Sequence, residues 1–394
     1  MTKELEVKGD YNAGSKSFSL AVETRQAILN FTFSGLTVGA TYQVDYRYGY
    51  MAAMEYTRSL VSSSSPLTAT GGTLSFACFA IVGDNFYHGI RLTNTADAGD
   101  VAELSLGQMS FTNKVYNVKR NWTGTAFIAP QTIDLSSVTT TDGNGNTYVT
   151  ARNGDVLTGS FSYEGYVTIA DGATVTLSDV NIDAPFEGDH AAIHCLGSAN
   201  IIVSGSDYND VNAGYNSDYP AVYVPSGKTL TISGSGRLRA YSNNAGCAAC
   251  IGGGFRIDCG NIVIAGGTIY ATSPGDGAAG IGSGQWGSCG TITITGGTVY
   301  ATGGQSAAGI GCGNSGSCGD ITIGSGITRV EVTMGNYSDY IIGGYNHGTV
   351  KIDGKEMSSD QLQYGVNSNP SEVEHIFTNL SSYCEGSTWT LYKE

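Results

Sequence analysis

The stretch CGNIVIAGGTIYAT, at residues 259–272, returns as CGTITITGGTVYAT at residues 289–302. The two copies are 30 residues apart, and a third begins at Cys318 after a further 29 residues. Repeats with periods of about 20 to 50 residues indicate solenoids or propellers, in which each repeat forms one structural unit. A propeller blade needs four strands and about 40 residues, so the shorter period here favours a solenoid.

The period can be followed in both directions through one apolar position in the first strand of each unit. Seven residues occupy that position, at intervals of 26 to 32 residues: Leu177, Val203, Ile232, Ile264, Ile294, Ile323 and Ile352. Each unit contains three short strands separated by glycine-rich turns, such as 291–295, 298–302 and 307–311. We therefore predict a parallel β-helix of about seven rungs, of 29–30 residues each, over residues 174–352.

Alternation within these strands predicts which side chains face the interior. Successive residues of a strand point to opposite faces, so Ile292 and Ile294 face inward while Thr293 faces solvent. No single rung can bury its own apolar face, and neighbouring rungs must therefore stabilise one another.

The remainder of the chain lacks this repeat. Five strand-like runs without a fixed period, at 17–22, 27–33, 41–50, 74–82 and 102–111, predict an antiparallel, jelly-roll-like β-sandwich for residues 1–126. Residues 127–173 form a connector that is expected to supply incomplete early rungs and to cap one end of the solenoid. Residues 353–394 are expected to cap the other end, because exposed end strands must be blocked. The predicted fold class is all-β.

Charge and hydropathy exclude several function classes. The net charge is −15 and the pI about 4.6, which argues against nucleic-acid binding and against an anionic membrane surface. No run approaches the length of a membrane-spanning helix, and the first residues lack the apolar stretch of a signal peptide. We expect either that a leader was trimmed or that the protein is made and assembled in a cytoplasm.

Aromatic side chains on the outward face suggest a binding surface. Tyr270 and Tyr300 share one rung position, Arg239 occupies the equivalent site one rung earlier, and Tyr241 lies two residues on. A row of flat rings on a solvated sheet is a natural platform for sugar faces, which stack on aromatic rings. The alternative is that tyrosine simply favours exposed strands.

Oxygen-bearing side chains gather in one segment and form a candidate Ca²⁺ site. They are Asp207, Asn209, Asp210, Asn212 and Asp218. Carboxylate and amide oxygens are the ligands that Ca²⁺ prefers. Asp and Asn also populate turns for purely local reasons, and this second interpretation is the favoured one.

The nine cysteines are an odd number spread through glycine-rich repeats, so most of them are expected to be reduced. Cys259, Cys289 and Cys318 fall on successive rungs, where small semi-apolar side chains stack readily. The alternative is a metal site, because Cys247 and Cys250 together with Cys259 offer three thiolates. Buried stacking is the favoured interpretation.

One further segment carries residue types used in acid–base or metal chemistry: Asp183, Glu187, Asp189, His190 and His194. No second acidic group recurs on an adjacent rung. A solvated loop is therefore the favoured interpretation.

The units GAAGIGSG at residues 277–284 and GTITITGGTVYATGG at residues 290–304 resemble the repeats of a bacterial family of carbohydrate-binding β-helices. The resemblance covers about residues 174–352. It implies binding of plant cell-wall polysaccharides of the cellulose and pectin type, with calcium as an associated ion.

The predicted layout, a β-sandwich followed by a β-helix, is also similar to that of bacteriophage fibres and tailspikes. In those proteins the first domain anchors to the particle and the solenoid faces the host glycan. Some tailspikes cleave their glycan with paired carboxylates. The aligned outward positions of this chain are mostly Thr, Tyr, Ser and Asn, which disfavours such a hydrolase.

These features predict a non-enzymatic structural and adhesion protein on the surface of a bacteriophage particle. Residues 1–126 would contact other virion proteins, and the β-helix would bind a polysaccharide or surface glycan, with a homotrimer as one candidate assembly. No cofactor is required, Ca²⁺ is the one candidate ion, and no nucleic acid or membrane partner is expected. A secreted bacterial carbohydrate-binding module, a glycan-cleaving tailspike and a purely structural decoration protein are the alternatives.

Overall fold

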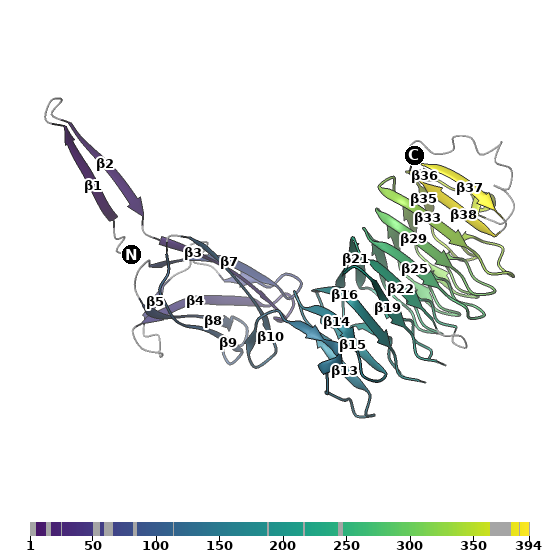
Figure 1. The fold of residues 1–394 in the computed structure, drawn as a ribbon, viewed down its shortest axis with the longest axis horizontal. Helices are drawn as coiled ribbons and strands as arrows, with labels where there is room; N and C mark the ends of the chain where they lie inside the picture. Colours follow the sequence, from purple (N-terminus) through teal and green to yellow (C-terminus); the bar gives the residue numbers. More distant parts are fainter. Residues whose placement is uncertain are drawn as a thin grey trace. The chain divides into compact units, whose positions relative to one another are not determined.

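The computed structural model describes residues 5–12, 17–24, 26–49, 56–58, 66–81, 85–112, 114–186, 189–215, 217–242, 247–362, 380–385 and 387–393. The chain divides into two compact units, Met1–Pro130 and Gln131–Glu394. Across the described part of the chain, no helix has the length and apolar character that crossing a membrane would require. Each unit is built from strands, as predicted (Figure 1).

The first unit contains two sheets and a separate hairpin, β1 (Leu5–Asn12) with β2 (Ser17–Thr24). One sheet has the order β11-β10-β3-β7, and the other has the order β5-β4-β8-β9 with β6 paired to β4. Their bounds are β3 (Gln26–Ser34), β4 (Thr41–Gly49), β5 (Tyr56–Arg58), β6 (Leu67–Thr68), β7 (Leu74–Ile81), β8 (Phe86–Asn94), β9 (Val101–Met109), β10 (Val115–Trp122) and β11 (Phe127–Ile128).

Both sheets contribute to one hydrophobic core, which makes this unit a sandwich. Phe31 and Phe76 from the first sheet stack with ring centroids 5.2 Å apart, and they share the core with Val44 and Leu92 from the second sheet. Buried residues alternate with partly or fully exposed ones along β4, and along β8 outside the irregularity at His88 and Gly89, as expected when one face of a sheet is solvated. The predicted antiparallel sandwich is confirmed, except that β3 and β10 pair in parallel.

The second unit is a parallel solenoid made of three stacks of strands (Figure 1). The first-strand stack is β12 (Thr132–Asp134), β14 (Val156–Ser160), β16 (Ala173–Asp183), β18 (Ala199–Ser204), β21 (Thr229–Gly234), β24 (Asn261–Ile264), β28 (Ile292–Ile294), β32 (Ile321–Ile323) and β35 (Val350–Ile352). The second-strand stack is the end of β16, β19 (Tyr208–Asn212), β22 (Arg237–Tyr241), β25 (Thr268–Thr272), β29 (Gly297–Thr302) and β33 (Ile327–Thr333).

The third-strand stack is β13 (Thr147–Ala151), β15 (Gly165–Ile169), β17 (Ile193–Cys195), β20 (Val222–Tyr223), β23 (Ile251–Gly252), β26 (Ile281–Gly282), β30 (Ile310–Gly311) and β34 (Ile342–Gly343). Two short strands, β27 (Ser288–Cys289) and β31 (Ser317–Cys318), pair at the corner between the third and first strands.

Six coils carry all three strands in the described residues, compared with about seven predicted. The predicted last rung, at Ile352, contributes only β35, after which the chain reverses into β36 (Lys355–Glu356). At the same end, β38 (Thr388–Tyr392) pairs antiparallel with β33 and with β37 (Ser381–Glu385). The six complete coils are preceded by incomplete ones that contain β12 to β15.

The stacking register differs from the prediction at one step. Ile232, Ile264, Ile294, Ile323 and Ile352 pair in that order, as predicted. However, Ile232 pairs with Ile201, while Val203 pairs with Gly234. A shift of two residues keeps the same side chains facing inward, so alternation alone cannot distinguish Ile201 from Val203.

Stacked glycines explain the Ala-Gly-Ile-Gly repeat of the third strands. Gly252, Gly282, Gly311 and Gly343 pair with one another in succession. Gly282 has a φ of 138°, and an ideal Cβ there would lie 1.9 Å from the carbonyl oxygen of Gly311. Any larger residue would push the coils apart, so these positions require glycine.

The cysteines of the solenoid are mostly interior groups. Cys289 pairs in register with Cys318, and the sulfur atoms of Cys312 and Cys318 lie 2.6 Å apart. Burial raises the pKa of Cys250 to about 12, so this interior group is a neutral thiol. Together with the absence of any metal-competent cluster of His, Cys, Asp or Glu among the described residues, this gives no support to the metal site at Cys247, Cys250 and Cys259.

Replacing Ile294 with alanine tests the inward stack. Ile294 is fully buried between Ile264 and Ile323, and the neighbouring coils hold the cavity open. We expect the free energy of unfolding to fall by about 2–5 kcal/mol in urea titrations followed by circular dichroism. The outward-facing control Thr293→Ala should cost less than about 1 kcal/mol. Equal losses in the two variants would contradict the assigned facing of β28.

Candidate functional site

Outward side chains of the second strands form columns, because paired residues on stacked strands lie about 4.8 Å apart. The central column contains, from one coil to the next, Asn181, Asp210, Arg239, Tyr270, Tyr300 and Glu331. A flanking column contains Asp183, Asn212, Tyr241, Thr272, Thr302 and Thr333. The parallel register therefore gathers residues that are far apart in the sequence on one face.

Tyr270 and Tyr300 form a stacked pair on this face. Their ring centroids are 4.8 Å apart and their planes differ by 5°. The ring of Tyr208 lies 5.9 Å from that of Tyr270. Partial burial, followed by the neighbouring phenols Tyr208 and Tyr300, raises the pKa of Tyr270 above its ordinary value. The phenol of Tyr270 is therefore a neutral hydrogen-bonding group at physiological pH.

Asp210 and Arg239 are joined by a bidentate ion pair beside the stacked rings. Nε of Arg239 lies 2.5 Å from Oδ1 of Asp210, and Nη2 lies 2.6 Å from Oδ2. The guanidinium carbon is 4.1 Å from the centre of the Tyr208 ring, within cation–π distance. Hydrogen bonding to Asp210 raises the pKa of Arg239. Two bonds and one ring contact thus fix this long side chain in one orientation.

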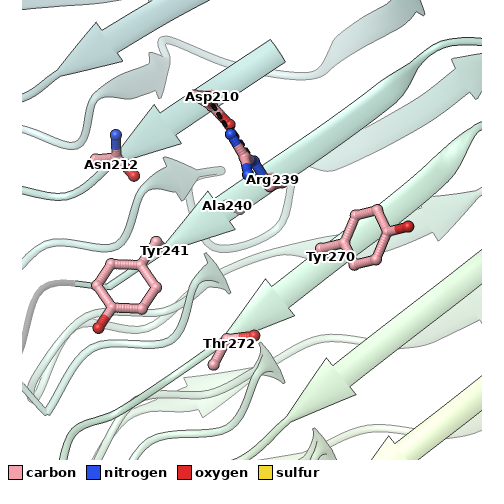
Figure 2. Close-up of a pocket in the computed structure, with 7 residues that line it drawn as sticks. All are labelled: Asp210, Asn212, Arg239, Ala240, Tyr241, Tyr270 and Thr272. Atoms are coloured by element: carbon pink, nitrogen blue, oxygen red, sulfur yellow. Dashed lines mark hydrogen bonds and ion pairs between the residues drawn. The ribbon is translucent and has the colours of Figure 1, made fainter. Parts of the chain in front are cut away.

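Two shallow pockets share this ion pair. The first, of about 290 Å³, is lined by Asp210, Asn212, Arg239, Ala240, Tyr241, Tyr270 and Thr272 (Figure 2). The second, of about 270 Å³, is lined by Gly159, Ser160, Asp179, Val180, Asn181, Asp207, Tyr208, Asp210 and Arg239. Figure 2 shows the rings of Tyr241 and Tyr270 around the first pocket, with the Asp210–Arg239 contact at its margin. Together the pockets offer aromatic surface, hydroxyls and carboxylates.

The four residues predicted to bind carbohydrate all lie on this face. Arg239, Tyr241 and Tyr270 line the first pocket, and Tyr300 stacks on Tyr270. Tyr208 is not among the predicted residues, although it contacts Arg239 and lines the second pocket. The contact of Tyr208 with Arg239 follows only from the register between β19 and β22. The repeat is too degenerate in this region for that register to be predicted from the sequence.

The five residues of the predicted Ca²⁺ site do not converge. Asn209 is fully buried, and its side-chain amide donates to the carbonyl oxygens of Ser204 (2.9 Å) and Arg237 (3.0 Å). Asp210 is held by Arg239, and Asp218 lies in the turn between β19 and β20. These five residues do not fit one Ca²⁺ ion, and a calcium requirement stays a prediction.

The acidic and histidine segment divides between two faces. The Asp183 carboxylate accepts hydrogen bonds from the amides of Asn181 and Asn212 on the second-strand face. His190 instead stacks on Tyr166, with ring centroids 4.3 Å apart, and His194 packs 4.9 Å from Tyr223. These histidines are packed among tyrosines, which differs from the favoured solvated loop. Glu187 lies outside the described residues.

Comparison with known proteins supports the class of fold. A family model described as a beta helix repeat matches residues 262–285 and 292–314, which include β24 to β26 and β28 to β30. The matched segments lie at the centre of the solenoid, so the family model and the structure agree that this part of the chain consists of β-helix repeats. No curated protein and no solved structure matches it.

The partly buried His194 predicts a pH dependence of stability. Burial, followed by the nearby His190, lowers the pKa of His194 from 6.5 to about 4. The unfolded chain therefore takes up this proton first, and stability is lost as the pH falls from about 6.5 to 4. The loss should reach up to about 2 kcal/mol, allowing for partial exposure. It is measurable as the difference between urea titrations of the wild type and His194→Gln at pH 7 and pH 4.5; an unchanged pH dependence in the variant would contradict it.

Proposed function

We propose that this β-helix repeat protein is a non-catalytic glycan-binding adhesion protein, which holds a polysaccharide along the outward face of its second strands. The observation that carries this proposal is the stacked pair Tyr270 and Tyr300 beside a pocket with hydrogen-bonding groups. Sugar rings have an apolar face and hydroxyl-bearing edges, and this surface offers a partner for each.

The dimensions of the face favour a polymer over a single sugar. The two pockets lie on either side of the Asp210–Arg239 pair, and the tyrosine stack continues the surface along the solenoid. Each coil adds one position to every column at the strand spacing. A chain of sugars could therefore contact several coils, and weak contacts at each coil would add.

The pairing of Asp210 with Arg239 favours a binding role over cleavage. Glycosidases use two carboxyl groups that flank the scissile bond, one as acid and the other as base or nucleophile. Asp210, the carboxylate shared by both pockets, accepts two hydrogen bonds from Arg239. A carboxylate whose two oxygens are both engaged by a guanidinium is poorly placed to act on a glycosidic bond.

The proposed setting is a bacteriophage particle, in which the sandwich unit attaches the protein and the solenoid contacts the host glycan. The two separate cores are consistent with a division of roles between attachment and binding. A secreted bacterial carbohydrate-binding module is the alternative setting. Mass spectrometry of purified particles and of particle-free culture medium would discriminate between the two.

A screen of the full chain against a glycan array tests binding. We expect at least one polysaccharide to bind, and a Tyr270→Ala/Tyr300→Ala variant to lose about tenfold or more in affinity, about 1.4 kcal/mol. The control is Tyr337→Ala, which removes a ring that is 77% exposed in the turn after β33. Retained binding by the double variant would overturn the assigned face, and no binding to any glycan would overturn the proposal.

Two further arms of the same screen address calcium and catalysis. Loss of binding in the presence of a chelator, with the tyrosines intact, would support a Ca²⁺ site. Release of reducing ends or unsaturated sugars from a bound polysaccharide would support the glycan-cleaving alternative. We expect neither, because Asp210 is paired with Arg239 and Asn209, another candidate Ca²⁺ ligand, is buried.

A further inference from the structure

The charges around the two pockets are unbalanced. Asp179, Asp207 and Asp210 line the second pocket, whereas Arg239 is the one basic side chain among the residues that line either pocket. Arg237 pairs in register with Tyr208, and its guanidinium carbon lies 5.3 Å from the centre of the Tyr208 ring, but it lines neither pocket. The groove therefore carries an excess of negative charge where a ligand would enter.

The charge of Arg239 is already balanced by Asp210, which leaves little net positive charge for an anionic ligand. Its Nε and Nη2 atoms are committed to the two oxygens of Asp210, and its guanidinium lies over the ring of Tyr208. A ligand carboxylate could form a bidentate pair with Nε and Nη2 only by displacing Asp210, and a contact with the remaining Nη1 would bring it close to the Asp210 carboxylate. That exchange would leave Asp210 without its cation beside the incoming negative charge, and like charges at such separations repel strongly near a protein surface.

The other two carboxylates are fixed as hydrogen-bond acceptors. Oδ1 of Asp179 accepts from the backbone N–H of Asp207 at 2.7 Å, and Oδ1 of Asp207 accepts from the N–H of Tyr208 at 2.8 Å. An ionised carboxylate has no proton to donate, and each group retains a second oxygen. Their natural partners are donors, such as the hydroxyl groups of an uncharged sugar. A uronate, sulfate or phosphate group offers further acceptors and is repelled.

We propose that the ligand of this face is an uncharged polysaccharide and that polymers rich in uronic acids are rejected. This inference rests on the proposed glycan-binding function. It differs from the pectic ligands implied by the resemblance of the repeats, because pectic chains are themselves polyanions.

Matched polymers provide the test. Uncharged glucans, mannans and galactans would each be presented to the full chain before and after oxidation of their C6 hydroxymethyl groups to carboxylates. At about 10 mM salt, where charges act over some 30 Å, we expect the carboxylated form of the bound polymer to bind about tenfold or more weakly. At about 1 M salt the difference should largely disappear, because the Debye length falls to about 3 Å.

A charge-neutralising variant locates the effect. Asp179→Asn/Asp207→Asn keeps the oxygen that accepts each backbone N–H, and asparagine tolerates the positive φ of 57° at position 179. We expect this variant to bind the carboxylated polymer more tightly than the wild type does. Asp171→Asn/Asp258→Asn is a matched control, since Oδ1 of each residue accepts one backbone N–H, at 2.8 and 2.7 Å, away from both pockets. The control should change the discrimination less than the pocket variant does.

The outcomes separate this inference from the function on which it rests. Tighter or equal binding of the carboxylated polymer by the wild type would overturn the inference and leave glycan binding in place. An equal gain in the variant and its control would show that net charge alone discriminates, which would also overturn the assigned groove. Failure of every polymer, charged and uncharged, would overturn the proposed function itself.

Discussion

The structure depends on the stacking of like side chains at the strand spacing. The inward isoleucines from Ile232 to Ile352 follow one another in register, and each is fully buried. Burying such a side chain contributes about 1.5–3 kcal/mol, yet no coil can exclude water from its own isoleucines. The coils above and below bury these side chains. The stability of the unit therefore depends on keeping the stack in register.

The same register arranges the candidate site. An outward-facing residue has little freedom of position when its neighbours along the strand are packed in the core. Ala271 and Ala301 pair in register in the core, and this pairing aligns Tyr270 with Tyr300 beside them. Their ring planes are nearly parallel because the backbone already holds the two rings at stacking distance. Likewise, the Asp210–Arg239 pair bridges consecutive coils, with its geometry set by two strands that the core has fixed. The site is therefore preorganised at little additional cost in conformational entropy.

The structure can be predicted from the sequence in those parts of the molecule where the repeat of glycine turns and apolar pairs is regular. From Ile232 onward, glycine turns and paired apolar residues recur so regularly that the register, the facing of Tyr270 and Tyr300, and the class of fold all follow. Earlier coils lack the double-glycine turn, and the two inward residues of β18 are interchangeable by alternation. The contact of Tyr208 with Arg239 and the inward turn of Asn209 depend on that missing register, so neither could be predicted.

The column of paired glycines in the third strands has a consequence for how such a chain can change length. An inserted residue in any strand would place a side chain where the next coil allows none, and the mismatch would extend to both neighbours. A duplicated whole coil, by contrast, meets the same glycine on each side and reproduces every inward and outward contact. Evolution can therefore lengthen or shorten this solenoid only in whole coils, and its outward surface changes extent in the same discrete steps.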